Sequence, residues 1–247
     1  MNKLNILVAN DDGINERGLH ILANALTKYA NVYVCAPDSG RSAFSHSIML
    51  LKPITFERVN VIKGIECYQT NGTPADCVRL ATSLLDVKFD MVFSGINNGL
   101  NLGTDILYSG TVAAAREGHI QYIPSIAISV DRNCYDIAEN EIEILLDFIF
   151  EKKIYSGDYT LNINFPTKEH IKSKGIKFAS QGIKRFKTEF EHIEGVEYKE
   201  ASSLITYDEN ENTDVYLAKQ GYITIVPLKV NQTNTLVLES LKKTYEF

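Results

Sequence analysis

Two adjacent carboxylates follow the first apolar segment of the chain. The segment Ile6–Ala9 contains only Ile, Leu, Val and Ala, and Asn10, Asp11, Asp12 and Gly13 come directly after it. Neighbouring anions repel each other, so we expect a cation or a shared proton beside them. An Asp-Asp-Gly sequence after a strand is also common in ordinary turns, so the motif alone leaves both interpretations open.

Oxygen-rich side chains also follow two later apolar segments, at 38–47 (DSGRSAFSHS) and at 94–111 (SGINNGLNLGTDILYSGT). Besides the two aspartates, the amides and hydroxyls available are those of Asn10, Asn97, Asn98, Asn101, Ser39, Ser42, Ser45, Ser109 and Thr111. Hard oxygen ligands suit Mg²⁺ or Mn²⁺. The glycine-rich segment that leads into a helix at Gly110 offers backbone N–H groups, which favour an anion. A metal ion beside an anion site predicts phosphate chemistry.

Each of these features also has a simpler interpretation. Ser42 taken alone is typical of a solvated loop, and asparagines such as Asn97 tolerate left-handed turns. The sequence NGTPADC at 71–77 is explained almost fully by a helix cap at Thr73. The occurrence of three such polar loops at predicted strand ends favours the functional interpretation.

Strands and helices alternate along most of the chain. Leu19, Leu22 and Leu26 recur at helical spacing between two apolar segments, which predicts a βαβ unit. Further strands are expected at 66–70, 90–95, 124–130, 159–166 and 221–228, and further helices at 73–85, 110–118 and 138–150. The alternation predicts a Rossmann-like α/β fold of three layers, with a mostly parallel sheet covered on both faces. Ligands bind outside the carboxyl ends of such strands, so the three polar segments are expected to converge there.

Composition limits the class of protein. The 247 residues are 45% hydrophobic, and 25 basic residues against 31 acidic ones give a net charge of −6, which argues against nucleic acid as a partner. We expect no signal peptide at the N-terminus and no membrane association, because no apolar stretch reaches spanning length. Four widely spaced cysteines without C-x-x-C pairing favour reduced thiols in a cytoplasmic protein and make zinc unexpected.

The pattern changes after Pro166. Residues 172–247 are rich in β-branched and charged residues, show little helical periodicity and contain the acidic stretch TYDENENTD at 206–214. We expect residues 1–171 to form the catalytic core, and residues 172–247 to form a β-rich arm and a closing strand that serve oligomerisation.

The motifs resemble those of the SurE nucleotidase family. Matching stretches occur in order along nearly the whole chain and are ILVANDDG, VCAPDSGRSAFSHSI, NGTPADCV, MVFSGINNGLNLGTDILYSGTVAAAREG, PSIAIS, LNINFP and DVYLAKQGYITIVPL. The long central element combined with NDDG makes this resemblance highly specific. Ala9, where Thr is usual, and the variant loop 38–47 depart from the family pattern without removing a ligand.

The resemblance implies a divalent-metal-dependent 5'-nucleotidase. Such an enzyme hydrolyses nucleoside 5'-monophosphates, and also 3'-monophosphates and short polyphosphate, as a homodimer or homotetramer. One Mg²⁺ or Mn²⁺ ion per subunit would be held by Asp11, Asp12, Ser42 and Asn97. Base preference stays open, because Phe44 and His46 lie in the variant loop.

The roles expected at the site follow from this ligand set. Asp11, Asp12 and Asn97 are the expected catalytic residues, and Asp11 is the candidate for orienting or deprotonating the attacking water, a role that the sequence does not separate from Asp12. Contacts to substrate phosphate are expected from Ser42, Asn101, Ser109, Gly110 and Thr111.

Two other functions deserve comparison. A haloacid-dehalogenase-like phosphatase would also place Asp after the first strand, but its two aspartates stand two apart as D-x-D, whereas Asp11 and Asp12 are adjacent. A nucleotide-binding regulator would bind without hydrolysis. The chain has no G-x-x-x-x-G-K-[ST] sequence, which disfavours a nucleoside triphosphate switch.

Overall fold

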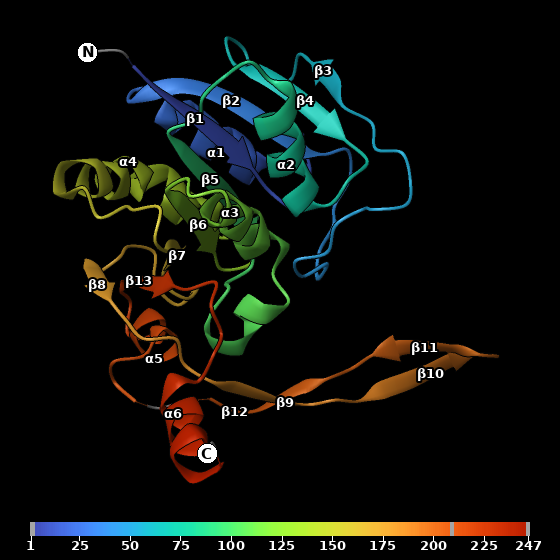
Figure 1. Ribbon diagram of the computed structural model, residues 1–247, viewed down its shortest axis with the longest axis vertical. Helices are drawn as coiled ribbons and strands as arrows, with labels where there is room; N and C mark the ends of the chain where they lie inside the picture. The colour runs from blue at the N-terminus through green and yellow to red at the C-terminus, as the bar shows by residue number, and fades with distance from the viewer. Residues whose placement is uncertain (1–2, 208–209, 246–247) are drawn as a thin grey trace.

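A computed structural model describes residues 3–207 and 210–245, and within these ranges nine strands form one central sheet (Figure 1). In spatial order the strands are β3 (Glu57–Val59), β4 (Glu66–Thr70), β2 (Ala30–Pro37), β1 (Leu4–Ala9), β5 (Met91–Asn98), β6 (Ser125–Val130), β7 (Thr160–Asn164), β13 (Ile223–Leu228) and β8 (Ile176–Phe178). The strands from β4 to β7 run parallel, while β3 pairs antiparallel with β4 and β13 pairs antiparallel with β7. The edge strand β8 is parallel to β13. The predicted α/β fold with a mostly parallel sheet is confirmed.

Helices cover both faces of this sheet. Helices α1 (Arg17–Leu26) and α4 (Tyr135–Lys152) pack together on one face, and α2 (Pro74–Leu84) and α3 (Gly110–Ile120) pack together on the other. Alternate residues of β1 serve the two cores: Ile6 belongs to the cluster with α1 and α4, and Leu7 belongs to the cluster with α2. Burial on both faces explains why β1 is apolar without interruption.

Helix α2 begins where its cap predicts. The Thr73 side chain accepts a hydrogen bond from the Asp76 backbone N–H at 3.1 Å, and the Asp76 carboxylate accepts one from the Thr73 N–H at 3.1 Å. These two bonds form a capping box in front of Pro74, so the sequence signal is confirmed.

The C-terminal part contributes to the sheet and also leaves the body of the protein. Strands β9 (Lys184–Lys187) and β12 (Ser203–Tyr207) pair antiparallel, and β10 (Phe190–Glu194) and β11 (Glu197–Glu200) continue them as a ribbon that projects outward (Figure 1). Strand β13 lies beside β7 in the central sheet. The β-rich arm and the closing strand were expected, and the boundary at residue 171 stays a prediction.

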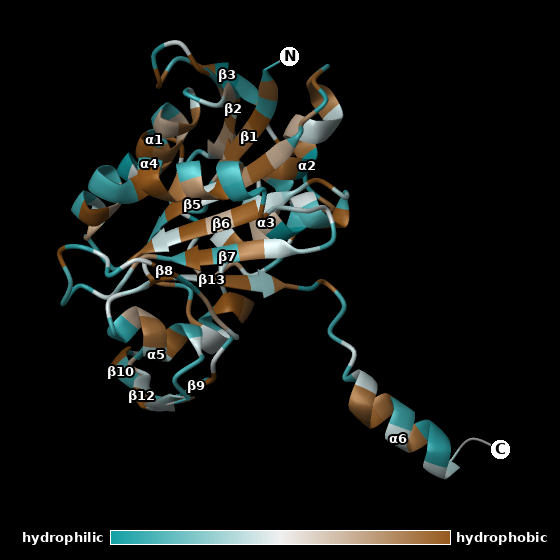
Figure 2. Ribbon diagram, turned by 90° about the vertical axis from the view of Figure 1, so that its left-hand side faces the viewer, coloured by the Kyte–Doolittle hydropathy of each residue, from teal (hydrophilic) through white to brown (hydrophobic). Residues whose placement is uncertain are grey.

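The expectation of little helix in this part was wrong. Helix α5 (Asp214–Lys219) is six residues long, too short to show a period, and α6 (Thr235–Tyr245) extends away from the body (Figure 2). In α6 the order Thr-Leu-Val-Leu is as compatible with a strand as with a helix, which explains the error. Of the acidic stretch, residues 208 and 209 lie outside the described residues.

The strand order places a switch point between β1 and β5. The chain leaves β1 through α1 to reach β2 on one side, whereas β5, β6 and β7 continue on the other side. At such a point the loops after neighbouring strands diverge and leave a crevice for ligands. Among the described helices, none combines the length and apolar character needed to cross a membrane.

Candidate functional site

A cleft of about 450 Å³ lies at the carboxyl ends of β1 and β5. It is lined by Asp11, Asp12, Ser42, Ala43, Asn97, Asn98, Gly99, Asn101, Asp105, Tyr108, Ser109, Arg132 and Glu200. Six of the eight residues expected at the site line this cleft, and Gly110 and Thr111 do not. We call it the carboxylate cleft.

Hydrogen bonds tie the three polar segments together. The Asp11 carbonyl accepts a bond of 2.7 Å from the Arg41 backbone N–H, which anchors the loop after β2 to the loop after β1. The Ser45 N–H donates to the Tyr108 carbonyl at 3.1 Å, which anchors the same loop to the segment before α3. The segments therefore meet at one edge of the sheet, although they are far apart in the sequence.

The carboxylates of Asp11 and Asp12 carry charge at a poorly solvated position. Asp11 is buried, and its burial raises its pKa to about 6; a hydrogen bond from the Thr111 hydroxyl lowers the pKa and the charge of Asp12 raises it. Burial also raises the pKa of Asp12, whose Oδ2 accepts a 3.0 Å hydrogen bond from the Asn98 N–H that partly offsets the effect. The pair therefore favours a nearby positive charge.

Gly110 and Thr111 act on Asp11 rather than on the cleft. A Cβ at Gly110 would lie 2.8 Å from the Asp11 Cβ, so only glycine lets the first turn of α3 come this close. Thr111 is buried, and its hydroxyl donates to Asp11 Oδ1. Ser109 is the N-cap of α3, since its Oγ accepts a 3.0 Å bond from the Val112 N–H, and it also lines the cleft.

An irregularity in the pairing of β5 with β6 precedes Asn97 and Asn98 at the end of β5. Gly95 has φ +130, and a Cβ there would lie 2.3 Å from the Ile128 carbonyl oxygen, so β5 presses against β6 where the register shifts. The Asn97 amide then donates to the Gly99 carbonyl at 2.6 Å, which fixes the orientation of its side chain.

Asn101 is held in a buried polar network. Its side-chain amide donates to Ser129 Oγ at 2.8 Å, and its backbone N–H donates to Asn164 Oδ1 at 2.8 Å. Its carbonyl accepts bonds of 2.9 Å and 3.1 Å from Asn162 and Asn164. The amide donor is engaged, so the described contacts of Asn101 position the loop that follows β5.

Four lining residues with polar side chains were missed by the sequence analysis. Asp105, Tyr108 and Glu200 add two carboxylates and a phenol, and Arg132 is the only cationic side chain among the described residues that line the cleft. Arg132 follows β6, so the strand-end rule that found the other loops could also have found it. Glu200 belongs to β11, and no local pattern in the sequence indicates that this residue lies at the cleft.

The donor set fits a hard divalent cation. Among the described residues, no group of three or more His, Cys, Asp and Glu side chains is arranged to hold a metal ion. An ion here would therefore rest on two carboxylates, those of Asp11 and Asp12, with neutral oxygens from Ser42 and Asn97. This oxygen-only set suits Mg²⁺ or Mn²⁺. The charge of the ion would offset the desolvation and the smaller repulsion from Asp12 that raise the pKa of Asp11.

Comparisons with known proteins give matches that span most of the chain. The model of the family described as "Survival protein SurE" matches residues 6–188. Two proteins named 5'-nucleotidase SurE, from Clostridium botulinum strains Langeland / NCTC 10281 / Type F and Eklund 17B / Type B, are each 42% identical over 98% of this chain and over 99% and 100% of their own lengths. The crystal structure of the SurE protein from Aquifex aeolicus is similar with a TM-score of 0.81 at 33% identity, covering 98% of this chain and 100% of that one.

Replacing Asp11 by Asn tests the electrostatics of the metal-free protein. The folded state holds the Asp11 proton up to pH about 6 and the unfolded chain only up to 3.8, so the free energy of unfolding falls as pH rises through this window. The Asp11→Asn variant has no carboxyl group at this position, so its free energy of unfolding does not fall for this reason. The difference in free energy of unfolding between the variant and the wild type should therefore shift in favour of the variant by about 1 kcal/mol between pH 5 and pH 8. Urea unfolding in the presence of a chelator measures it.

The matched control is Asp86→Asn, an exposed carboxylate just beyond the end of α2 and outside the cleft. It should show no comparable dependence on pH. Equal behaviour of the two variants would contradict the buried charge at Asp11.

Proposed function

The chain belongs to the SurE family and is a 5'-nucleotidase, and we propose that it hydrolyses nucleoside 5'-monophosphates in the carboxylate cleft with the help of a divalent metal ion. The observation that carries this proposal is the pair of the buried Asp11 and the half-buried Asp12 at the switch point of the sheet, beside the capped N-terminus of α3. We include 3'-monophosphates and short polyphosphate in the proposed substrate range, and the cytoplasm as the site of action.

The proposed ion is one Mg²⁺ or Mn²⁺ per subunit, held by Asp11, Asp12, Ser42 and Asn97. When bound, it supplies a Lewis acid that polarises the phosphate and makes a neighbouring water more acidic. The high pKa of Asp11 and the engaged amide of Asn97 support these assignments.

The protein's own groups perform the rest of the reaction. Asp11 is the proposed acceptor of the proton from the attacking water, because its carboxylate lines the cleft beside the proposed ion and is close to a water held there. The Ser109 hydroxyl, which lines the cleft, and the positive end of the α3 dipole behind it are proposed to stabilise the charge that develops on the phosphate. Arg132 supplies the positive side chain that the acidic cleft otherwise lacks.

Chelation combined with Asp12→Asn tests the metal dependence. EDTA should abolish phosphate release from 5'-AMP, and Mg²⁺ or Mn²⁺ should restore it. Asp12→Asn removes one ligand charge at nearly constant shape, so kcat/KM at limiting metal should fall by at least about 100-fold. Asp86→Asn is the control, and full activity of the chelated enzyme or of Asp12→Asn would exclude this mechanism.

Ser109→Ala separates phosphate binding from helix capping. Loss of the cap should lower the free energy of unfolding by about 1 kcal/mol. Loss of a hydrogen bond to a charged phosphate should in addition lower kcat/KM for 5'-AMP by about 10- to 100-fold, with little change in metal affinity. Thr213→Ala, which removes the cap of α5, is the control because Thr213 does not line the cleft. Unaltered kinetics in Ser109→Ala would restrict Ser109 to capping.

The projecting ribbon is the proposed contact between subunits of a homodimer or homotetramer. Its exposed apolar side chains include Phe190, Ile193, Val196 and Tyr198, and Val196 is 93% exposed. Helix α6, which extends away from the body, leaves Leu236 85% exposed. Apolar surface of this kind is stabilised by a partner.

Shortening the ribbon tests this contact. Replacing Thr188–Ser202 by an Asn-Gly turn joins the paired ends Lys187 and Ser203 and keeps Asp214, whose carboxylate accepts bonds from the Gly103 and Gly182 N–H groups. Light scattering should then report a smaller particle than for the full chain. Glu191→Gln, on the exposed ribbon, is the control and should leave the mass unchanged. A particle of unchanged mass in the shortened variant would reject the ribbon as the contact.

A further inference from the structure

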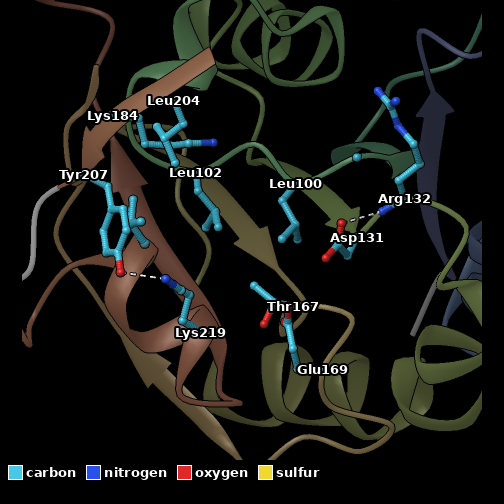
Figure 3. Close-up of a pocket in the computed structure, with 12 residues that line it drawn as sticks. Leu100, Leu102, Asp131, Arg132, Thr167, Glu169, Lys184, Leu204, Tyr207 and Lys219 are labelled. Atoms are coloured by element: carbon cyan, nitrogen blue, oxygen red, sulfur yellow. Dashed lines mark hydrogen bonds between the residues drawn. The ribbon is translucent and has the colours of Figure 1, made fainter. Parts of the chain in front are cut away.

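A second cavity, of about 430 Å³, adjoins the carboxylate cleft (Figure 3). Gly99 and Arg132 line both cavities, so the two share an edge. The other lining residues are Leu100, Leu102, Asp131, Thr167, Glu169, Lys184, Leu204, Tyr207, Val215 and Lys219.

Part of the wall of this second cavity is apolar and well supported. Leu102 and Val215 are buried in one hydrophobic cluster, and Leu100 and Tyr207 pack against it. The Tyr207 ring is held in place by Lys219, whose Nζ donates to the phenol oxygen at 2.6 Å and lies 4.1 Å from the ring centroid (Figure 3). Charged side chains also line the cavity, and they are those of Asp131, Arg132, Glu169, Lys184 and Lys219. The Thr167 hydroxyl lowers the pKa of the Glu169 carboxyl.

The shared edge is open. A Cβ at Gly99 would meet only the Asn97 Nδ2, at 3.8 Å, so no bulky side chain separates the cavities at this residue. The guanidinium of Arg132 at the same edge offers a positive charge to a phosphate group. A phosphate ester with its phosphate beside Asp11 and Asp12 can therefore extend its organic part across Gly99.

We propose that the second cavity binds the nucleoside of the substrate, with the base against Leu100, Leu204 and Tyr207 while the phosphate lies in the carboxylate cleft. This inference rests on the proposed function. A nucleobase is flat, largely apolar on its faces and polar at its edge, and it carries no charge at neutral pH, so it matches apolar walls with polar groups beside them. The cavity volume lies in the range typical of small-molecule sites, roughly 300–1,000 Å³. Asp131 and Glu169 provide acceptors for ribose hydroxyls.

The proposal gives the C-terminal segment a second role. Leu204 and Tyr207 belong to β12, Lys184 to β9 and Val215 to α5. The part of the projecting ribbon that joins the body of the protein therefore forms one wall of the nucleoside cavity. Leu204 is then a residue that determines specificity. Its neighbour Ile205 is 63% exposed on the same strand and is not among the residues that line the cavity.

The experiment compares Leu204→Trp with Ile205→Trp on two substrates, 5'-AMP and ribose 5-phosphate, which lacks the base. The larger side chain at 204 should obstruct the base, so the ratio of kcat/KM for 5'-AMP to that for ribose 5-phosphate should fall by about 10-fold or more. Ile205→Trp should leave this ratio unchanged. An unchanged ratio in Leu204→Trp would overturn the proposal.

Binding of adenosine in the presence of a chelator supplies a readout independent of catalysis. By calorimetry the wild type and Ile205→Trp should bind adenosine at millimolar concentrations or below, and Leu204→Trp should bind it at least several-fold more weakly. Equal affinity of the two variants, or no binding by the wild type, would overturn the proposal. A wild type that binds adenosine in this pattern but releases no phosphate would instead contradict the proposed function.

A second location for the base is also tested. Tyr108 is a 63% exposed aromatic residue that lines the carboxylate cleft but not the second cavity. If Tyr108→Ala lowers the substrate ratio and Leu204→Trp does not, the base lies on the Tyr108 side of the cleft and the proposal is wrong.

Discussion

The constraint on which the rest of the site depends is the burial of one carboxylate beside another. Burial raises the pKa of both Asp11 and Asp12, because each charge loses solvation. The Thr111 hydroxyl and the Asn98 N–H offset part of this loss. Both donors lie at or after the end of β5, so β1 and β5 must be adjacent with their carboxyl ends level, as their parallel pairing from Ile6 and Met91 onward requires. The switch point between β1 and β5 therefore also determines which donors offset the buried charges of Asp11 and Asp12.

Close packing around Asp11 follows from the same constraint. A donor can offset a buried charge only at hydrogen-bond distance, and Thr111 reaches Asp11 because Gly110 leaves no Cβ between α3 and the loop after β1. The N-cap Ser109 then accepts a hydrogen bond from the Val112 N–H, which is one of the N–H groups that have no partner within the helix. The sequence Ser-Gly-Thr therefore combines a cap, a close approach and a donor in three consecutive residues.

Much of the fold could be predicted because its signals are local. The apolar run of β1, the spacing of Leu19, Leu22 and Leu26, and the cap at Thr73 each report a structure that forms within a few residues. Helix α5 was not predicted because it is too short to show a helical period, and α6 was not predicted because its order of residues suits a strand equally well. The chain alone gives α6 no partner, so no buried stripe identifies it.

The site was predictable to the extent that it lies at strand ends. The loops that contain Asp11, Asp12, Ser42 and Asn97 could be placed together because each follows a predicted parallel strand, and such ends gather at one edge of a sheet. The choice of these four residues within the loops came from the family resemblance. The roles of Gly110 and Thr111 were not predictable in detail, because they depend on the distance between α3 and Asp11. The contribution of Glu200 was not predictable either, since it depends on the direction in which the ribbon leaves the body.

The two ends of the ribbon are under different physical constraints. At its base, Asp214 accepts hydrogen bonds from Gly103 and Gly182, and Thr104 donates to the Lys184 carbonyl at 2.6 Å, so the segment between β5 and α3 is fixed by buried polar contacts to the C-terminal part. At its far end, β10 and β11 are exposed along their whole length. Residues at the base are therefore constrained by the shape of the cavities they line, whereas residues at the far end are constrained by whatever surface covers them. One segment can therefore line the substrate cavity with the residues at one end and contact a second subunit with the residues at the other end, so that each set of residues is constrained by one role.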